Sequence, residues 1–315
     1  MKKILFILLA VVIGGMQTMS AKTWRVNNLD NSADFQDMDK AIETIAAGDT
    51  IYLEGSSNYY ILSNAITKKV AIIGPGYFLE ENPNTQVSKT PAQIRSTNAT
   101  TGIVLLAAGI SIEGVNLYHY TYVGADNITI KRCYMGNDIS FTKQVNAVVN
   151  NATIIQNYVY GNKIDGNNIA NNCIVTNNLS HGISFFNKST IENNTIISTA
   201  STALSNNTGC SIKNNITTGT SYYNTNCDIS NNSTATTSDY ITQSTASTDG
   251  KYQIASTSAL MTSGTNGSQI GAFGGSSPYV LSGLPSVPHI YEIDAPNTAS
   301  KVSGLQVTIK VGTEK

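Results

Sequence analysis

The stretches CIVTNNLS (residues 173–180), STIENNTI (189–196) and CSIKNNIT (210–217) are three copies of one pattern. Each begins with Cys or Ser, carries Val or Ile two residues later, and then has a pair of Asn residues. The apolar position recurs every 16 to 24 residues, at Ile112, Ile130, Ile154, Val175, Ile191, Ile212 and Ile229. Asn stands three residues later in the last five copies, at Asn157, Asn178, Asn194, Asn215 and Asn232. The chain therefore contains a repeat of about 20 residues.

Each repeat is predicted to hold a short strand, a bend and a second short strand. Small or apolar residues also stand two positions before the repeated Ile or Val, which indicates a strand with one buried face. Asn suits the bend because it tolerates the left-handed backbone region, and Asn amides stacked about 4.8 Å apart can bond to one another. A unit of this size cannot bury its own apolar face. We therefore expect the repeats to stack into a solenoid of parallel strands.

This pattern, from about Thr23 to Asp239, resembles the right-handed parallel β-helix of the pectate-lyase-like superfamily, in which an Asn column occupies one of the turns. The resemblance implies an all-β, right-handed parallel β-helix solenoid. That superfamily includes lyases, hydrolases, adhesins and proteins without assigned chemistry, so the resemblance does not choose an activity.

The first residues have the layout of a secretory signal peptide. Lys2 and Lys3 precede an apolar run from Ile4 to Ile13, and small residues follow up to Ala21. The run is short for a bilayer span, and no Cys nearby could carry a lipid anchor. The mature chain would have 17 basic and 20 acidic residues. We therefore expect a secreted, periplasmic or cell-surface protein without a stable membrane span or a nucleic-acid partner.

The two ends are predicted to close the solenoid. Residues Phe35 to Ala47 have helical spacing with Asp34 placed as a cap, and Thr50 to Leu53 and Lys69 to Ile73 are predicted strands. Ile290 to Ile293 and Leu305 to Val311 alternate like strands of a C-terminal β tail. The predicted divisions are a signal peptide (1–21), an N-terminal helix cap with the first coils (22–101), repeats (102–239), a Ser/Gly-rich end (240–289) and a β tail (290–315).

Three of the four cysteines of the mature chain are expected to face inward from the coils. Cys173, Cys210 and Cys227 share one column. Cys210 and Cys227 lie in adjacent coils, so they could form a disulfide or remain buried thiols. Cysteines spaced one per coil without His do not favour zinc, and no cofactor is predicted.

Catalytic residues are not evident in the sequence. Asp126, Asp138, Asp165, Glu192 and Asp228 are isolated acids of the repeats. Lys131, Arg132 and Lys163 could act as a lyase base or substrate clamp if they faced a groove with Asp126 or Asp138. Asp165-Gly166 and His181-Gly182 resemble two polygalacturonase-like motifs, but the remaining motifs are missing.

Tyrosines suggest a different kind of site. Tyr134 and Tyr158 follow the aligned position in successive coils, beside Tyr160, and Tyr118 lies in the preceding coil. Such a column either packs across strands or offers flat faces to sugar rings. The sugar-contacting residues predicted on the second interpretation are Tyr118, Tyr134, Tyr158, Tyr160 and His181. The sequence thus favours a glycan-contacting or structural protein of the cell envelope, with a polysaccharide or cell-surface glycan as partner. The alternative is a polysaccharide lyase or glycoside hydrolase.

Overall fold

The computed structural model describes residues 21–98, 101–144, 147–198, 203–217, 223–241, 246–299, 301–302 and 304–314. The predicted signal peptide, apart from Ala21, lies outside these residues. None of the helices in the described ranges has the length and apolar character needed to cross a membrane.

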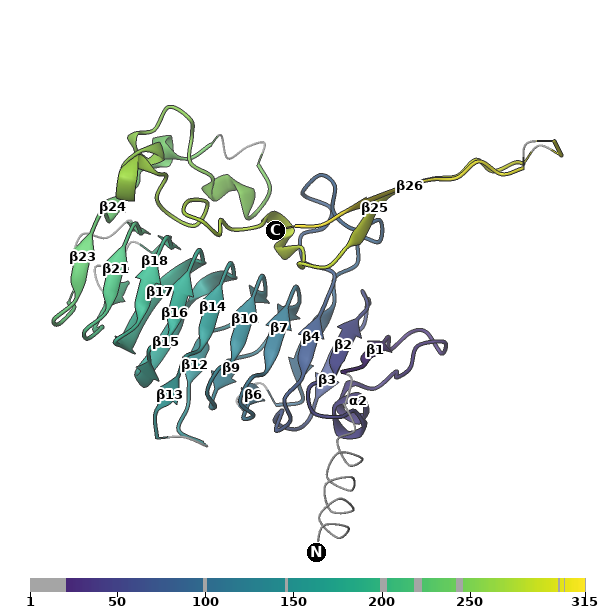
Figure 1. Cartoon of the computed structure of the whole chain (residues 1–315), viewed down its shortest axis with the longest axis horizontal. Coiled ribbons are helices and arrows are strands. Elements are labelled where there is room, and N and C mark those ends of the chain that lie inside the picture. The colour runs from purple at the N-terminus through teal and green to yellow at the C-terminus, as the bar shows by residue number, and fades with distance from the viewer. Residues whose placement is uncertain are drawn as a thin grey trace, which may run out of the picture.

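Two long sheets of parallel strands enclose one apolar core (Figure 1). The first sheet contains ten strands, in the order β1 (Thr23–Val26), β2 (Thr50–Leu53), β4 (Ala71–Ile73), β7 (Ser111–Glu113), β10 (Thr129–Lys131), β14 (Thr153–Ile155), β16 (Ile174–Thr176), β18 (Thr190–Glu192), β21 (Ser211–Lys213) and β23 (Asp228–Ser230). The repeated Ile and Val residues pair in register across this sheet and are buried, apart from Ile229 in the last strand.

The second sheet contains fourteen strands. Its main path runs through β3 (Tyr60–Leu62), β5 (Gln93–Ser96), β8 (Asn116–Leu117), β11 (Tyr134–Met135), β15 (Tyr158–Asn171), β17 (Leu179–Asn187), β19 (Thr195–Ile196), β22 (Ile216–Thr217) and β24 (Ser233–Thr234). The strands that pair beside this path are β6 (Ile103–Leu105), β9 (Thr121–Val123), β12 (Ile139–Phe141), β13 (Val149–Asn150) and β20 (Leu204–Ser205). Because both sheets are built from successive coils paired in parallel, the predicted all-β parallel β-helix is confirmed.

Two bends bound each strand of the repeat in the first sheet, and a residue with positive φ lies at each bend. The first set is Gly109, Asn127, Asn151, Asn172, Lys188, Gly209 and Asn226. The second set, here called the outer turn residues, is Gly114, Arg132, Gln156, Asn177, Asn193, Asn214 and Asn231. The prediction that the aligned Asn adopts the left-handed conformation was wrong, because that conformation belongs to the residue just before it.

The aligned asparagines point inward and join the coils to one another. The Oδ1 atom of Asn194 accepts hydrogen bonds from the backbone N and the Nδ2 of Asn178, both at 3.0 Å. Its Nδ2 donates to the carbonyl oxygen of Val175 at 2.8 Å and to Oδ1 of Asn215 at 2.9 Å. Equivalent bonds continue the column from Asn157 to Asn232. The amides therefore satisfy backbone groups at the bend, where the strand pairing is interrupted.

The N-terminal cap contains the helix α2 (Met38–Thr44). Asp37 caps this helix by accepting a hydrogen bond from the backbone N of Lys40 at 2.8 Å. The prediction of Asp34 as the cap was wrong: Phe35 forms a bridge with Val26, and Asp34 accepts from the backbone N of Arg25 instead. The helix therefore begins later than its apolar spacing predicted.

The chain after β24 forms a lobe and then runs back along one edge of the solenoid (Figure 1). The lobe contains the short 3-10 helices η1 (Thr237–Asp239), η2 (Gly250–Tyr252) and η3 (Ala259–Met261). The returning segment, residues 265–286, is here called the C-terminal strap and includes η4 (Thr265–Gly267) and η5 (Leu281–Gly283). It is followed by an antiparallel hairpin of β25 (His289–Asp294) and β26 (Thr308–Gly312), in agreement with the predicted β tail.

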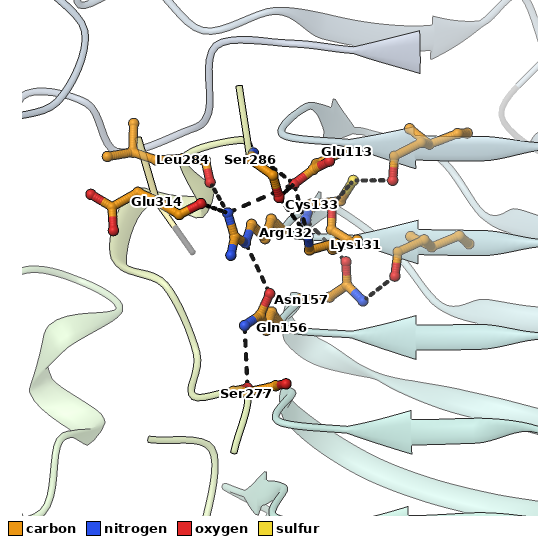
Figure 2. Close-up of polar contacts among 12 residues, drawn as sticks. Glu113, Lys131, Arg132, Cys133, Gln156, Asn157, Ser277, Leu284, Ser286 and Glu314 are labelled. Carbon is orange, nitrogen blue, oxygen red and sulfur yellow. Dashed lines mark hydrogen bonds and ion pairs between the residues drawn. The ribbon is translucent and has the colours of Figure 1, made fainter. Parts of the chain in front are cut away.

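The outer turn residues hold the strap. Asn177 Nδ2 donates to the carbonyl oxygens of Ala272 and Gly274 at 2.9 and 2.8 Å. Gln156 Nε2 donates to the carbonyl oxygens of Ser277 and Pro278, and Figure 2 shows how Arg132 and Gln156 reach the strap from adjacent coils. One column of turn residues thus joins coil to coil, and the column beside it joins the coils to the strap.

The cysteines are free thiols, and Cys133, Cys173 and Cys210 are buried. The backbone N of Ser189 donates to Sγ of Cys210, and that of Cys210 donates to Sγ of Cys227, both at 3.3 Å. The sequence allowed either a disulfide between Cys210 and Cys227 or two thiols, and the structure has the thiols.

Candidate functional site

Two neighbouring columns of side chains face outward from the second sheet. The inner column contains Asn116, Tyr134, Tyr158 and Leu179, which pair directly across β8, β11, β15 and β17. The residues two positions further along these strands form the outer column. The outer column therefore contains Tyr118, Gly136, Tyr160 and His181, and only its members are candidates for an open surface.

The inner column is covered. Tyr134 and Tyr158 stack with ring centroids 5.9 Å apart, and Phe78 packs against both rings at 5.5 and 5.4 Å. Tyr158 is only 1% exposed and shares an apolar cluster with Ala272 and Tyr279. The prediction that Tyr158 contacts a sugar is therefore corrected, because the strap and the loop containing Phe78 enclose its side chain. Tyr134 is half-buried beside it.

The outer column is accessible. Tyr160 is 49% exposed and Tyr118 is 36% exposed, while His181 is half-buried. The ring of His181 meets that of Tyr160 edge to face at 5.6 Å. At the other end, Tyr59 meets Tyr118 at 5.2 Å. The exposed aromatic groups thus follow the solenoid axis, and Gly136 leaves one coil between Tyr118 and Tyr160 without a side chain.

Burial keeps the histidines near this column in their neutral form. Desolvation lowers the pKa of His181 below its ordinary value of 6.5. Desolvation also lowers the pKa of His119, with a further contribution from the charge of Arg95. A neutral imidazole has one donor and one acceptor nitrogen, so His181 is suited to hydrogen bonding with a polar ligand.

A charged cluster adjoins the outer column. Asp138 Oδ1 accepts from the backbone N of Lys163 at 3.0 Å, and Lys163 Nζ forms an ion pair with Asp165 Oδ2 at 2.7 Å. The hydrogen bond from Asp165 raises the pKa of Lys163, and Asp138 and Tyr120 contribute in the same direction. The structure therefore brings together Lys163 and Asp138, which the sequence could only suggest.

The other predicted cations do not join this cluster. Lys131 forms an ion pair with Glu113 at 3.3 Å and donates to Ser286 Oγ. Arg132 is buried beneath the strap (Figure 2). The possibility that they clamp a substrate is therefore not supported, because their partners belong to the protein itself.

A buried polar group beneath the strap escaped sequence analysis. The hydroxyl groups of Tyr77 and Tyr279 form a hydrogen bond, and Asp249 accepts from the Tyr279 hydroxyl at 3.2 Å and from the backbone N of Ser282 at 2.7 Å. Burial raises the pKa of both tyrosines well above the ordinary value. Since 202 residues separate Tyr77 from Tyr279, no local pattern could reveal this contact.

The acids are too dispersed to suggest a metal centre. Within the described ranges, no three His, Cys, Asp or Glu residues gather in a way that could hold a metal ion.

Comparisons with known proteins find few relatives. No family model matches the chain, and no curated protein matches it. Among solved structures, the crystal structure of pectate lyase Pel9A covers 81% of this chain and 97% of its own, with 12% identity and a TM-score of 0.43. A mannuronic acid specific polysaccharide family 6 lyase from human gut microbiota covers 64% of this chain and 66% of its own, with 12% identity and a TM-score of 0.28. The class of protein is defined by the strand pairing: the chain is a parallel β-helix protein.

Proposed function

We propose that this protein is an exported β-helix that contacts a polysaccharide or cell-surface glycan through the outer column. Export rests on the sequence of residues 1–21. The binding surface rests on Tyr118 and Tyr160, which are exposed, and on the half-buried His181, while the neighbouring Tyr158 is covered. Tyrosine presents a flat apolar ring with a polar edge, and sugars have both apolar ring faces and hydroxyl groups.

The single observation that carries this proposal is the difference between the two columns. If the tyrosines served packing alone, the strap could cover both columns in the same way. Instead it encloses Tyr158, while Tyr160, two residues along the same strand, is half exposed. The covered column fits a structural role, and the exposed column fits contact with a ligand.

Binding to a glycan array, followed by titration of each hit, tests the proposal. We expect Tyr118→Ala and Tyr160→Ala to weaken binding, and Tyr223→Ala to leave it unchanged. Tyr223 is a matched control because it is 63% exposed and lies between β22 and β23, outside the outer column. No glycan binding, or equal loss in all three variants, would leave only a structural role.

A polysaccharide lyase or hydrolase is the second candidate. The observation in its favour is that Asp138, Lys163 and Asp165 converge from adjacent coils beside the exposed column. The ion pair opposes it, because a raised pKa keeps Lys163 protonated whereas a general base must accept a proton. Measuring the release of reducing ends or unsaturated products, with calcium and with chelator, decides between the candidates. If the protein releases products and Lys163→Met does not, the protein is an enzyme and the binding proposal is wrong.

A further inference from the structure

A buried carboxylate lies beside the start of the predicted mature chain. Asp49 is 4% exposed and immediately precedes β2. Its Oδ1 accepts a hydrogen bond from the backbone N of Lys22 at 2.9 Å. Its Oδ2 accepts from Trp24 Nε1 at 2.8 Å and from the backbone N of Ala46 at 3.1 Å. This carboxylate therefore joins the beginning of the first sheet to the loop that follows α2.

Asp49 carries its charge without an ion pair. The ion pairs formed among the described residues do not include this carboxylate. The Nζ of Lys22 lies over the ring of Trp24, 3.5 Å from its centroid. The pKa of Asp49 is below its ordinary value chiefly because of the hydrogen bonds from the backbone of Lys22 and the side chain of Trp24. A carboxylate withdrawn from water is costly unless a positive charge pairs with it, so a cation at this position would stabilise the fold.

The donor from Lys22 is the one that processing would change. The predicted signal peptide ends at Ala21, and both Ala21 and Lys22 are exposed. Hydrolysis of the peptide bond between them adds water, leaving a carboxylate on Ala21 and an amino group on Lys22. This amino group is protonated at neutral pH, because α-amino groups have a pKa of about 8. The neutral N–H that faces Asp49 would thus become an ammonium group, and charge-assisted hydrogen bonds are the stronger kind.

We infer that cleavage between Ala21 and Lys22 creates an amino terminus that Asp49 binds as an ion pair, so that processing completes the N-terminal cap. This inference rests on the export part of the proposed function and does not depend on glycan binding. Since β1 is the first strand of the first sheet, the ion pair secures the end of the solenoid at which the stacking of coils begins. The protein therefore reaches its full stability only after its export signal has been removed.

Two forms of the protein test the inference. One begins at Lys22, released from an N-terminal fusion by a protease that leaves no additional residue, and the other retains Ser20 and Ala21. Both forms carry one α-ammonium group, so they differ only in its position. We expect the form that begins at Lys22 to melt about 3 °C higher at pH 7.

The difference between the two forms should depend on pH. Pairing with Asp49 raises the pKa of the amino terminus in the folded protein. Its stabilisation is fully present below the unfolded pKa of about 8 and is lost as the pH rises through the raised folded value. The two melting temperatures should therefore approach each other by about pH 10. The side chains of Lys22 and Lys68 are common to both forms, so their titration cancels in the comparison.

Substitution of the carboxylate identifies the cause. With Asp49→Asn in both forms, the two melting temperatures should agree. Glu43→Gln is the matched control, because it removes an exposed acid from α2 and should leave the difference intact. Competitive labelling of the α-amino group, followed by mass spectrometry, gives its pKa in the unsubstituted protein even where Asp49→Asn does not fold. We expect a value above the ordinary one.

The outcomes separate this inference from the glycan proposal. Equal melting temperatures of the unsubstituted forms, a difference that survives Asp49→Asn, or an ordinary pKa of the amino terminus would overturn the inference. N-terminal sequencing of the exported protein should find Lys22 first, and another first residue would also overturn it. Retention of the full chain inside the cell would overturn export as well. None of these results decides whether the outer column binds glycans, which the array tests.

Discussion

The guanidinium group of Arg132 donates from Nη1 to the carbonyl oxygen of Leu284 at 2.9 Å, across 152 residues of sequence. Its Nε donates to Oε1 of Gln156 in the next coil at 2.9 Å. Burial lowers the pKa of Arg132, although the charge of Glu113 acts in the opposite direction. A side chain that the sequence presented as a possible surface cation is thus an anchor of the strap.

Replacement of this anchor should destabilise the protein. Arg132→Ala removes the buried donor to the carbonyl oxygen of Leu284 and to the amide oxygen of Gln156, and we expect the free energy of unfolding to fall by about 3 kcal/mol. Urea unfolding measures the change. Lys40→Ala, which breaks an exposed ion pair on α2, is the control and should cost less than about 0.5 kcal/mol. Similar costs for the two variants would argue against the anchoring role.

The asparagine column should be more sensitive in its middle than at its end. Asn194→Ala removes bonds to coils on both sides, and we expect a loss of about 3 kcal/mol or more. Asn232 ends the column and is partly exposed, so Asn232→Ala should cost clearly less. Thermal unfolding of the two variants provides the comparison. An equal loss would show that bonding to both neighbouring coils adds nothing.

Replacement by glycine should affect stability differently in the two sets of residues with positive φ. Asn172 is exposed with φ of 52°, so Asn172→Gly relieves the backbone and should change stability by less than about 1 kcal/mol. Asn177 has φ of 54° but also holds two strap carbonyls. Asn177→Gly should therefore cost about 2 kcal/mol, because buried acceptors lose their donor. Equilibrium unfolding distinguishes these outcomes, and a stabilised Asn177→Gly would contradict the account of the strap.

The reactivity of each cysteine thiol should follow its exposure to solvent. Desolvation raises the pKa of Cys133 to about 12 and those of Cys173 and Cys210 to about 11. These thiols should resist alkylation in the native protein, so that Cys227 alone reacts, and all four cysteines should react after unfolding. Mass spectrometry of the alkylated chain counts the modified sites. A mass deficit of two hydrogens under non-reducing conditions would instead reveal a disulfide.

Stability should fall between pH 7 and pH 5 because of His181. Its pKa is lowered in the folded chain, so the unfolded chain binds more protons as the pH drops below 6.5. The stabilising preference for the neutral form is fully present above that pH and is lost in part below it. The melting temperature of His181→Gln should depend less on pH over this interval than that of the unsubstituted protein. The same pH dependence in both proteins would show that His181 does not cause it.

The sequence predicts the fold well because the repeat is a local pattern. Ile191, Cys173 and Asn194 each carry their structural role in their spacing, and the parallel coils follow from it. The sequence predicts the candidate site poorly. Tyr158 and Tyr160 look alike in the sequence, but a segment more than 100 residues away covers one and leaves the other exposed. Asn207 and Asn224 form a second bonded pair, at 3.0 Å, which the sequence does not reveal because two copies make a weak pattern.

The strap also changes how the molecule should unfold. In an open solenoid each coil contacts only its neighbours, so stability is approximately a sum of local terms and the ends can unravel separately. Here the chain's own C-terminal part connects distant coils, from Asn214 near one end to Arg132 and Tyr77 toward the other. Loss of any one coil then releases contacts along much of the axis. A linear array of repeats thereby becomes a cooperative unit, with one unfolding transition in place of many.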